Sequence, residues 1–402
     1  MAPLSWQQLR NLVGRVNTDY LNGPTTSQAL LRLFGQEESD VRVTLYRDNH
    51  GWCPYCQKVW LWLEERRVPY RVKKVTMFCY GEKEAWYKKI CPAGMLPALE
   101  LDNRLITESD VILLNLEREF GPVHVKMEDP KVKILRKLER QIFYAWCGWL
   151  CYPSRNVREE NERKMNFLNT AHVVEKALAS TSGPYFLNQF STADIVFVPY
   201  LERMHASLFY YKGFLLRDEE NFPHISQWFD GLEARETYRG TQSDFHTHSH
   251  DLPPQMGGCY ESGDDHQQRC KERVDSCTDL ALPDCGYKEP EDSRHIALEK
   301  MVRHHDSILN REDNPMKGRD EPLRAAMTYM MTGQMETLPV GSEIALRYLR
   351  DRICVPRDMP IWSARRCREA LEAVATAVSD DQGPSIPTIH RRDQDPRYFR
   401  QQ

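Results

Sequence analysis

The tetrapeptide Cys53-Pro54-Tyr55-Cys56 constrains this chain more than any other feature. It follows an alternating run at residues 41–46 and precedes an apolar segment with charged flanks at 57–67. A thiol at a helix N-terminus faces unpaired backbone N–H groups and the positive end of the helix dipole. Both favour the thiolate, so a pKa near about 8.5 can fall to roughly 3.5–7.5. Proline also suits the first helical position. The motif therefore predicts Cys53 as an exposed nucleophile, with Cys56 one turn further on as a resolving thiol.

A pair of cysteines at this spacing also occurs in a structural disulfide or as half of a zinc site. The chain contains no second Cys-x-x-Cys that could complete a zinc site. A strand leading into a helix is also the usual context of a redox motif. We therefore favour thiol–disulfide chemistry.

Charge and hydropathy exclude several classes of function. The formal net charge of -4 gives no electrostatic case for nucleic acid, and no apolar run approaches the ~20 residues of a membrane span. We expect no signal peptide, and the twelve cysteines are not spaced as a compact disulfide framework. The first forty residues include Glu37, Glu38 and Asp40, unlike a transit peptide. We expect a cytoplasmic protein without nucleic-acid or membrane partners. A chloroplast form whose presequence has been removed is the alternative.

The segment from residue 41 to 120 alternates between strand and helix patterns. A hairpin is indicated by the Asp102-Asn103 turn, and Gly121-Pro122 ends the last helix. The β-α-β-α-β-β-α order is typical of a thioredoxin-like domain. We expect strands at 41–46, 70–75, 98–101 and 104–106, and helices at 54–67, 82–89 and 109–120.

Beyond residue 122 the pattern becomes helical, with apolar residues three and four positions apart. Ser191 followed by Asp194 forms a variant of the capping box, which we interpret as structural. The helices are expected at 131–150, 159–179, 192–207 and 222–236.

Residues 241–290 combine turn-forming residues with histidines and cysteines. The histidines alternate with other residues and lack helical i, i+4 spacing, and the cysteines are at least seven positions apart, whereas zinc modules pair their ligands closely. We therefore expect a solvated histidine loop and no bound metal. The residues concerned are His246, His248, His250, Cys259, Cys270, Cys277 and Cys285.

Helical patterns resume at 294–309, 322–332, 342–352 and 363–378. The basic run from Arg347 to Arg368 is interleaved with acids, and we expect an exposed helix face rather than a nucleic-acid patch. The polar, proline-containing tail from Ser379 is expected to be disordered.

Taken together, these motifs resemble the cytosolic glutathione transferase family, whose members join a thioredoxin-like domain to an all-helical domain. The resemblance covers about residues 41–240 and rests on the Cys-Pro-Tyr-Cys motif, Gly94-Met95-Leu96-Pro97-Ala98-Leu99, Thr107-Glu108-Ser109-Asp110, and the helix start at Ser191. The nucleophilic cysteine is similar to the omega, lambda and dehydroascorbate reductase classes. The appended region, with residues 345–350 and 355–359, is similar to the iota class. The implied domains are an extension at 1–40, a glutathione-binding domain at 41–122, an all-helical domain at 123–240, and a mostly helical extension at 241–402.

The resemblance implies a set of glutathione ligands. A cis peptide bond at Leu96-Pro97 lets the Leu96 backbone pair with the cysteinyl part of glutathione; an ordinary turn is the alternative. Glu108 is expected to meet the ligand's ammonium group, and Ser109 its γ-glutamyl carboxylate at a helix start, although this motif alone is only a helix cap. Lys83 is expected to bind the glycyl carboxylate, and a solvated lysine face explains it nearly as well.

The implied reaction is glutathione-dependent thiol–disulfide exchange, with glutathione as co-substrate and Cys53 carrying a mixed disulfide. Small or protein disulfides and dehydroascorbate are the expected substrates. A dithiol reductase of glutaredoxin or thioredoxin type, using Cys56, is one rival. A non-catalytic carrier is the other, with an apolar ligand held by Phe143, Tyr144, Trp146, Trp149 and Tyr152. The resemblance also predicts a homodimer formed through the first domain, unless the appended region blocks that contact.

Overall fold

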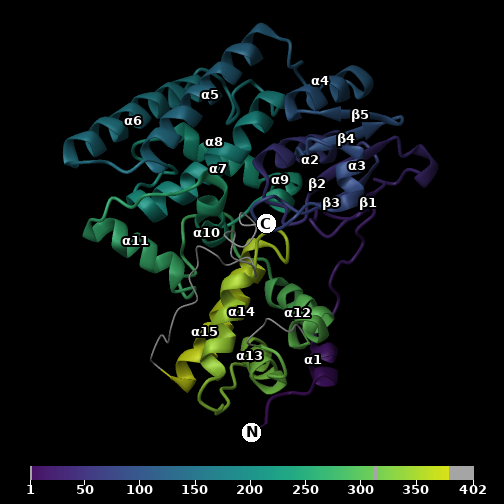
Figure 1. Cartoon of the computed structure of the whole chain (residues 1–402), viewed down its shortest axis with the longest axis vertical. Helices are drawn as coiled ribbons and strands as arrows, with labels where there is room; N and C mark the ends of the chain where they lie inside the picture. The colour runs from purple at the N-terminus through teal and green to yellow at the C-terminus, as the bar shows by residue number, and fades with distance from the viewer. Residues whose placement is uncertain (1, 311–315, 380–402) are drawn as a thin grey trace.

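The structure is a computed structural model that describes residues 2–310 and 316–379. Figure 1 shows the sheet and the helices of residues 54–241 gathered in one body, with the helices of residues 293–378 in a second body below it. The two helices of residues 245–275 pack against the helix of residues 192–212 in the first body. None of the helices in the described part of the chain is long and apolar enough to cross a membrane.

A five-stranded mixed sheet forms one side of the first body, in the order β1-β3-β2-β4-β5. Strand β2 (Val43–Asp48) runs parallel to β3 (Tyr70–Val75) and antiparallel to β4 (Ala98–Leu101), which forms a hairpin with β5 (Arg104–Thr107). Strand β1 (Leu31–Arg32) pairs antiparallel with β3 at the far edge. The sequence pattern did not predict β1, because two residues are too short to show an alternation.

Three helices complete this unit: α2 (Pro54–Arg66), α3 (Ala85–Ile90) and α4 (Ser109–Phe120). The predicted strand at 70–75 and the predicted helix at 109–120 have the observed bounds. Helix α3 begins three residues later than expected. Helix α2 is buried along most of its length because it lies against both α4 and α7.

The second part of the first body is a bundle centred on α7, every residue of which is buried. The predicted capping box is present at its start, where the Asp194 carboxylate accepts a hydrogen bond from the Ser191 N–H at 2.9 Å. This architecture confirms a thioredoxin-like domain followed by an all-helical one. The helices are α5 (Pro130–Leu150), α6 (Val157–Ala179), α7 (Thr192–Lys212), α8 (Pro223–Glu233) and α9 (Glu236–Thr241).

The expectation of a solvated loop at residues 241–290 is wrong. The segment folds into α10 (Phe245–Met256) and α11 (Asp265–Asp275), and all three histidines of α10 are at most 2% exposed. The sequence lacks an apolar stripe here, and Pro253 and Pro254 lie inside α10. The helix is buried through paired polar groups, a pattern that hydrophobic periodicity does not detect.

A second hydrophobic core lies in the lower body and is separate from the core around α7. It includes residues from both ends of the chain, since Leu9 is fully buried within it. The N-terminal helix therefore packs with the C-terminal helices, as Figure 1 shows. The elements involved are α1 (Trp6–Leu12), α12 (Ser293–Leu309), α13 (Asp320–Thr332), α14 (Ser342–Arg352) and α15 (Ile361–Val378).

The basic run does not form an exposed face, so that expectation is also wrong. Arg347 and Arg350 both donate to the Glu372 carboxylate, and Arg368 donates to Asp244. Buried ion pairs of this kind contribute little net stability but are costly to break singly. They fix α14 and α15 against each other and against α10. The four buried arginines of the run are Arg347, Arg350, Arg365 and Arg368. Beyond Ser379, the expected disordered tail lies outside the described residues.

Candidate thiol site

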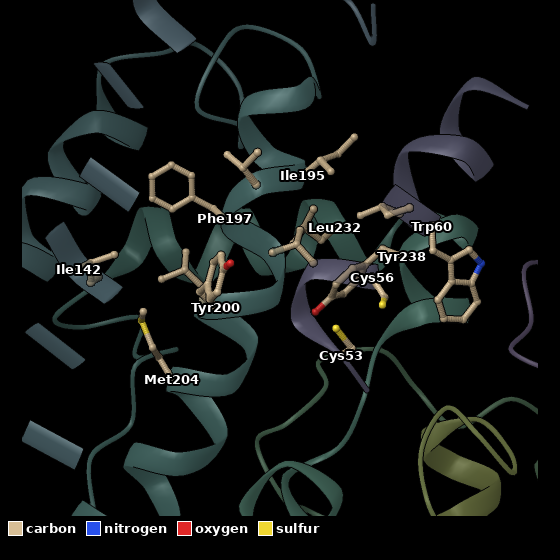
Figure 2. Packing of buried hydrophobic residues seen from close by; sticks show 14 of the residues in the cluster. Cys53, Cys56, Trp60, Ile142, Ile195, Phe197, Tyr200, Met204, Leu232 and Tyr238 are labelled. Atoms are coloured by element: carbon tan, nitrogen blue, oxygen red, sulfur yellow. The ribbon is translucent and has the colours of Figure 1, made fainter. Parts of the chain in front are cut away.

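The two cysteines of the motif open helix α2. Cys53 is its N-cap residue and Pro54 occupies the first turn, as predicted. The Cys53 side chain is only 5% exposed, however, so the expectation of an exposed thiol is wrong. Figure 2 shows Cys53 and Cys56 close together among buried side chains. Their sulfur atoms lie within 4.8 Å of each other and of a carboxylate oxygen of Asp48.

Cys56 is held as a neutral thiol. Burial raises the pKa of Cys56, and the neighbouring Cys53 and Asp48 raise it further. All twelve cysteines of the chain are free thiols in this structure. Cys56 is thus a buried thiol one turn behind Cys53.

Cys53 reaches a mostly apolar cavity of about 510 Å³. Met77 and Phe78 border it from the first domain, and Phe143 and Trp146 border it from α5. Lys83 and Leu96, two residues predicted to bind glutathione, also line this cavity. The structure therefore brings the nucleophile together with two of the predicted ligands.

A second cavity of about 310 Å³ contains Pro97, Glu108 and Ser109. It shares Tyr55, Met95, Leu96 and Tyr200 with the cavity at Cys53, so the two adjoin along the Leu96 segment. The Leu96-Pro97 peptide bond is cis. Glu108 has a φ of 64°, which is strained for a residue with a side chain, and such strain concentrates at ligand-binding sites. Six of the seven predicted site residues therefore line two adjoining cavities; the seventh, Cys56, lines neither.

The structure separates Lys83 from the lysines beside it. Lys88 and Lys89 are exposed on α3, whereas Lys83 lies before that helix and is half-buried. Its Nζ donates to the Thr76 carbonyl at 3.0 Å. Burial lowers the pKa of Lys83, while the nearby Cys56 and Cys53 sulfurs act in the opposite direction. A solvated lysine face therefore describes the two helical lysines but not Lys83.

Sequence reasoning missed the cations around the second cavity. Lys58 Nζ lies 3.1 Å from the Asp110 carboxylate, which Arg136 also contacts. Arg140 lines the same cavity from α5. The sequence did place Arg136 and Arg140 on one face of the predicted helix, because they are four residues apart. Without the fold, nothing indicated that this face meets Ser109.

Helix α10 forms the roof of the Cys53 cavity through Leu252, Gln255 and Met256. Trp52, the residue before the nucleophile, donates from its indole Nε1 to His248 Nδ1 at 3.0 Å. That bond assigns the remaining ring proton to Nε2, which lies 2.7 Å from a Glu202 oxygen. Burial lowers the pKa of His248, consistent with a neutral imidazole.

A second polar contact ties the roof to the first domain. The Tyr80 hydroxyl donates to Asp251 of α10 at 2.9 Å. Arg203 of α7 donates to the Trp52 carbonyl and, at 3.0 Å, to the Gln57 side chain. The region beyond residue 241 is therefore part of the cavity wall at Cys53, which its sequence did not predict.

The three histidines of α10 do not converge on one point. His248 faces Glu202, whereas His250 Nε2 bonds Asp275 at 2.9 Å. His246 lies with Cys277 and Asp351 in a buried group whose ligand atoms are within 4.8 Å of one another. That group, like the group of Asp48, Cys53 and Cys56, consists of residue types that bind metals. The absence of a bound metal stays a prediction.

The aromatic residues considered for a carrier site are divided between different environments. Phe143 and Trp146 line the Cys53 cavity. Trp149 packs in the core against Phe167 and Phe214, and Tyr144 and Tyr152 are exposed. A single aromatic ligand cleft is therefore not formed by the five together.

The fold and the site define a class: proteins with a cysteine at the start of the first helix of a thioredoxin-like domain that is joined to a helical domain. Residues 52–119 match the model for the glutathione S-transferase N-terminal domain, and residues 141–241 match the model for its C-terminal domain. The chain therefore contains one region that matches each of the two glutathione S-transferase domain models.

The chain is similar to several glutathione S-transferases. The chloroplastic glutathione S-transferase DHAR3 of Arabidopsis thaliana is 29% identical over 196 residues, which are 48% of this chain and 70% of that protein. Glutathione S-transferase L3 of the same plant is 27% identical over 48% of this chain and 79% of its own length. The crystal structure of glutathione transferase Omega 3C from Trametes versicolor is 27% identical, with a TM-score of 0.42 over 50% of this chain and 90% of that chain. These matches cover about half of the chain, and membership of the iota class stays a prediction.

Proposed function

We propose that this chain is a glutathione-dependent thiol transferase or reductase whose nucleophile is Cys53. The Cys53 thiolate attacks the glutathionyl sulfur of a disulfide R–S–S–G, forms Cys53–S–S–G and releases R–SH. The thiolate of a second glutathione then attacks the glutathionyl sulfur, which yields oxidised glutathione and frees Cys53. The net reaction converts R–S–S–G and one glutathione into R–SH and oxidised glutathione. Dehydroascorbate reduction follows the same logic with two glutathiones.

The observation that supports this proposal is the pair of adjoining cavities that hold Cys53 and the predicted ligands. Ser109 begins α4, where backbone N–H groups suit the γ-glutamyl carboxylate. We assign the Leu96 backbone, before the cis proline, to the cysteinyl unit. Lys83 lies at the other end, in the cavity of Cys53, for the glycyl carboxylate. We assign the extended tripeptide to this order, with its sulfur at Cys53.

Mass spectrometry tests the proposal directly. The reduced protein is incubated with oxidised glutathione, and adducts are located in wild type, Cys53→Ser and Cys56→Ser. We expect an adduct on Cys53 that persists when Cys56 is replaced, and loss of glutathione-dependent reductase activity in Cys53→Ser only. If Cys53 never reacts, the catalytic proposal fails and the carrier function takes its place.

Compartment and assembly are separate proposals. We infer a cytoplasmic or chloroplast location, and the relatives' names include chloroplastic and cytosolic forms. We also propose a homodimer, which analytical ultracentrifugation of the full chain tests. A monomer would indicate that the appended region blocks the expected contact.

A further inference from the structure

A cluster of three cysteines lies where the region beyond residue 241 meets helix α5. Cys147 belongs to α5, and Cys151 is the C-cap residue of that helix. Cys259 lies in the loop between α10 and α11. All three are half-buried and pack against the hydrophobic core of the first body. The proposed reaction at Cys53 uses none of these thiols.

Backbone hydrogen bonding brings Cys151 and Cys259 to the same junction. The Tyr260 N–H donates to the Leu150 carbonyl at 2.9 Å, so the peptide group between residues 259 and 260 meets the one between residues 150 and 151. In antiparallel sheets, residues that face one another across such bonds have Cα atoms about 5.5 Å apart. Disulfides usually join Cα atoms that are about 4.4–6.8 Å apart. A contact of this kind therefore suits a disulfide between Cys151 and Cys259.

The electrostatics of the three thiols distinguish their roles. The hydrogen bond from Cys147 lowers the pKa of Cys151, and the nearby Lys212 ammonium lowers it further, against the effect of burial. Burial raises the pKa of Cys259, and so does the neighbouring Cys151. Because the thiolate is the nucleophile in disulfide exchange, Cys151 is the thiol that reacts first with an oxidant. Cys259 is then in place to displace the group that Cys151 has bound.

The same junction connects two walls of the cavity at Cys53. Helix α5 lines this cavity through Trp146, and Cys151 caps the end of that helix. Helix α10 forms the roof, and its last residue, Met256, lines the cavity three positions before Cys259. The two intervening residues are glycines, which have the greatest backbone freedom. A disulfide at this junction fixes the end of the roof to the wall that α5 forms.

We propose that Cys151 and Cys259 form a reversible disulfide that holds the roof closed over Cys53; its effect on turnover rests on the proposed function of Cys53. The oxidant is oxidised glutathione, the product of the proposed reaction. Reduced glutathione in excess reverses the disulfide, so the enzyme responds to accumulation of its own product.

The chemistry consists of two thiol–disulfide exchanges. The Cys151 thiolate attacks one sulfur of oxidised glutathione, forms Cys151–S–S–G and releases one glutathione. The Cys259 thiolate then attacks the Cys151 sulfur and releases the second glutathione. Each departing glutathione thiolate takes up the proton lost by one cysteine. Two protein thiols are thus oxidised while one oxidised glutathione is reduced to two glutathiones.

Disulfide mapping without the proposed nucleophile tests whether this bond forms. Cys53→Ser protein is incubated with excess oxidised glutathione, its remaining thiols are alkylated, and unreduced peptides are identified by mass spectrometry. Two further substitutions are made in this protein. Cys259→Ser removes the closing thiol. Cys285→Ser replaces another half-buried cysteine of the appended region and is the matched control.

We expect a peptide that links Cys151 to Cys259 in Cys53→Ser and in the Cys285→Ser control. With Cys259→Ser, glutathione should remain attached to Cys151. A link between Cys147 and Cys151, or an unmodified Cys151, overturns the inference.

Hydrogen exchange measures whether the disulfide holds the roof, and it needs no variant beyond Cys53→Ser. Peptides from residues 251–260 should exchange several-fold more slowly in the oxidised than in the reduced protein, because local opening of α10 is restrained. Peptides from α13 in the second body should exchange at the same rate in both states. Equal exchange of residues 251–260 in the two states overturns the inference.

Progress curves connect the disulfide to turnover. Wild type and Cys259→Ser are pretreated with oxidised glutathione and then diluted into reduced glutathione with a glutathionylated substrate. Wild type should show a lag that ends as the disulfide is reduced, and Cys259→Ser should reach its full rate several-fold sooner. Equal lags contradict regulation by this disulfide. An absence of turnover in untreated wild type contradicts the proposed function of Cys53 instead, and mapping and exchange still decide whether the disulfide forms and holds the roof.

Discussion

Replacement of His248 by alanine tests whether helix α10 is a working part of the thiol site. His248 accepts the Trp52 indole N–H and faces Glu202, whose side chain is 5% exposed. The substitution leaves a buried indole donor without an acceptor, at about 1–3 kcal/mol, and removes a hydrogen bond to a charged group, at about 1.5–3 kcal/mol. Ser243 and Gln57 still bond Glu202, which limits the second loss. We expect the free energy of unfolding to fall by about 3–5 kcal/mol.

His250 on the same helix supplies a matched control. It is also buried, but it pairs with Asp275, whose side chain is 32% exposed, so water can replace the lost bond. We expect His250→Ala to lower the free energy of unfolding by only about 1–2 kcal/mol. Urea unfolding followed by circular dichroism and by tryptophan fluorescence measures both variants. Coincidence of the two transitions checks that unfolding is a single step.

The two variants should differ more in the reactivity of Cys53 than in stability. Loss of His248 loosens the roof formed by Leu252, Gln255 and Met256, so local opening should make alkylation of the buried Cys53 several-fold faster. His250→Ala should leave the rate unchanged. Peptide mapping after timed iodoacetamide treatment gives the rate at Cys53 alone. Equal acceleration in both variants, or none in either, refutes the reasoning that His248 holds the roof over the thiol.

Three further predictions concern ligand binding and stability. Ser109→Ala should raise the KM for glutathione about tenfold with little change in kcat, because a hydrogen bond to a carboxylate is worth about 1.5 kcal/mol; an unchanged KM in steady-state kinetics contradicts its role. Burial raises the pKa of Asp194 to about 6. Because the pKa of Asp194 is raised in the folded state, the free energy of unfolding should fall as pH rises from 4 to 7. Urea titrations should show a fall of about 3 kcal/mol in wild type relative to Asp194→Asn. A stability difference between the two proteins that does not change with pH argues against the raised pKa. Arg368→Ala leaves Asp244 buried and unpaired, and should cost about 3–5 kcal/mol in the same titrations; a cost below about 1 kcal/mol shows that the pair is replaced by water.

Much of the first domain could be predicted from the sequence because its signals are local. The bounds of β3 and α4 follow from apolar periodicity and from the Gly121-Pro122 stop. The cysteine motif, Leu96-Pro97 and Glu108-Ser109 each carry their chemistry within a few residues. That these segments lie near one another followed once the domain type had been inferred from their order.

The errors share a physical cause. The histidines of α10 and the arginines of α14 and α15 were expected to be solvated because polar residues are usually exposed. Their burial depends on partners distant in sequence, such as Glu202 for His248 and Glu372 for Arg347. A single sequence does not show which distant charges meet.

The sequence by itself therefore determined the kind of chemistry: a cysteine at a helix start, with a glutathione-binding pattern after it. The tertiary structure decided how that cysteine is housed. It buried Cys53 beneath a helix from the appended region, placed Asp48 beside Cys56, and packed the N-terminal helix α1 with α12 and α13. The reason is that helix and strand signals act over neighbouring residues, whereas burial, pairing of charges and access to a thiol depend on segments that meet only in the folded chain.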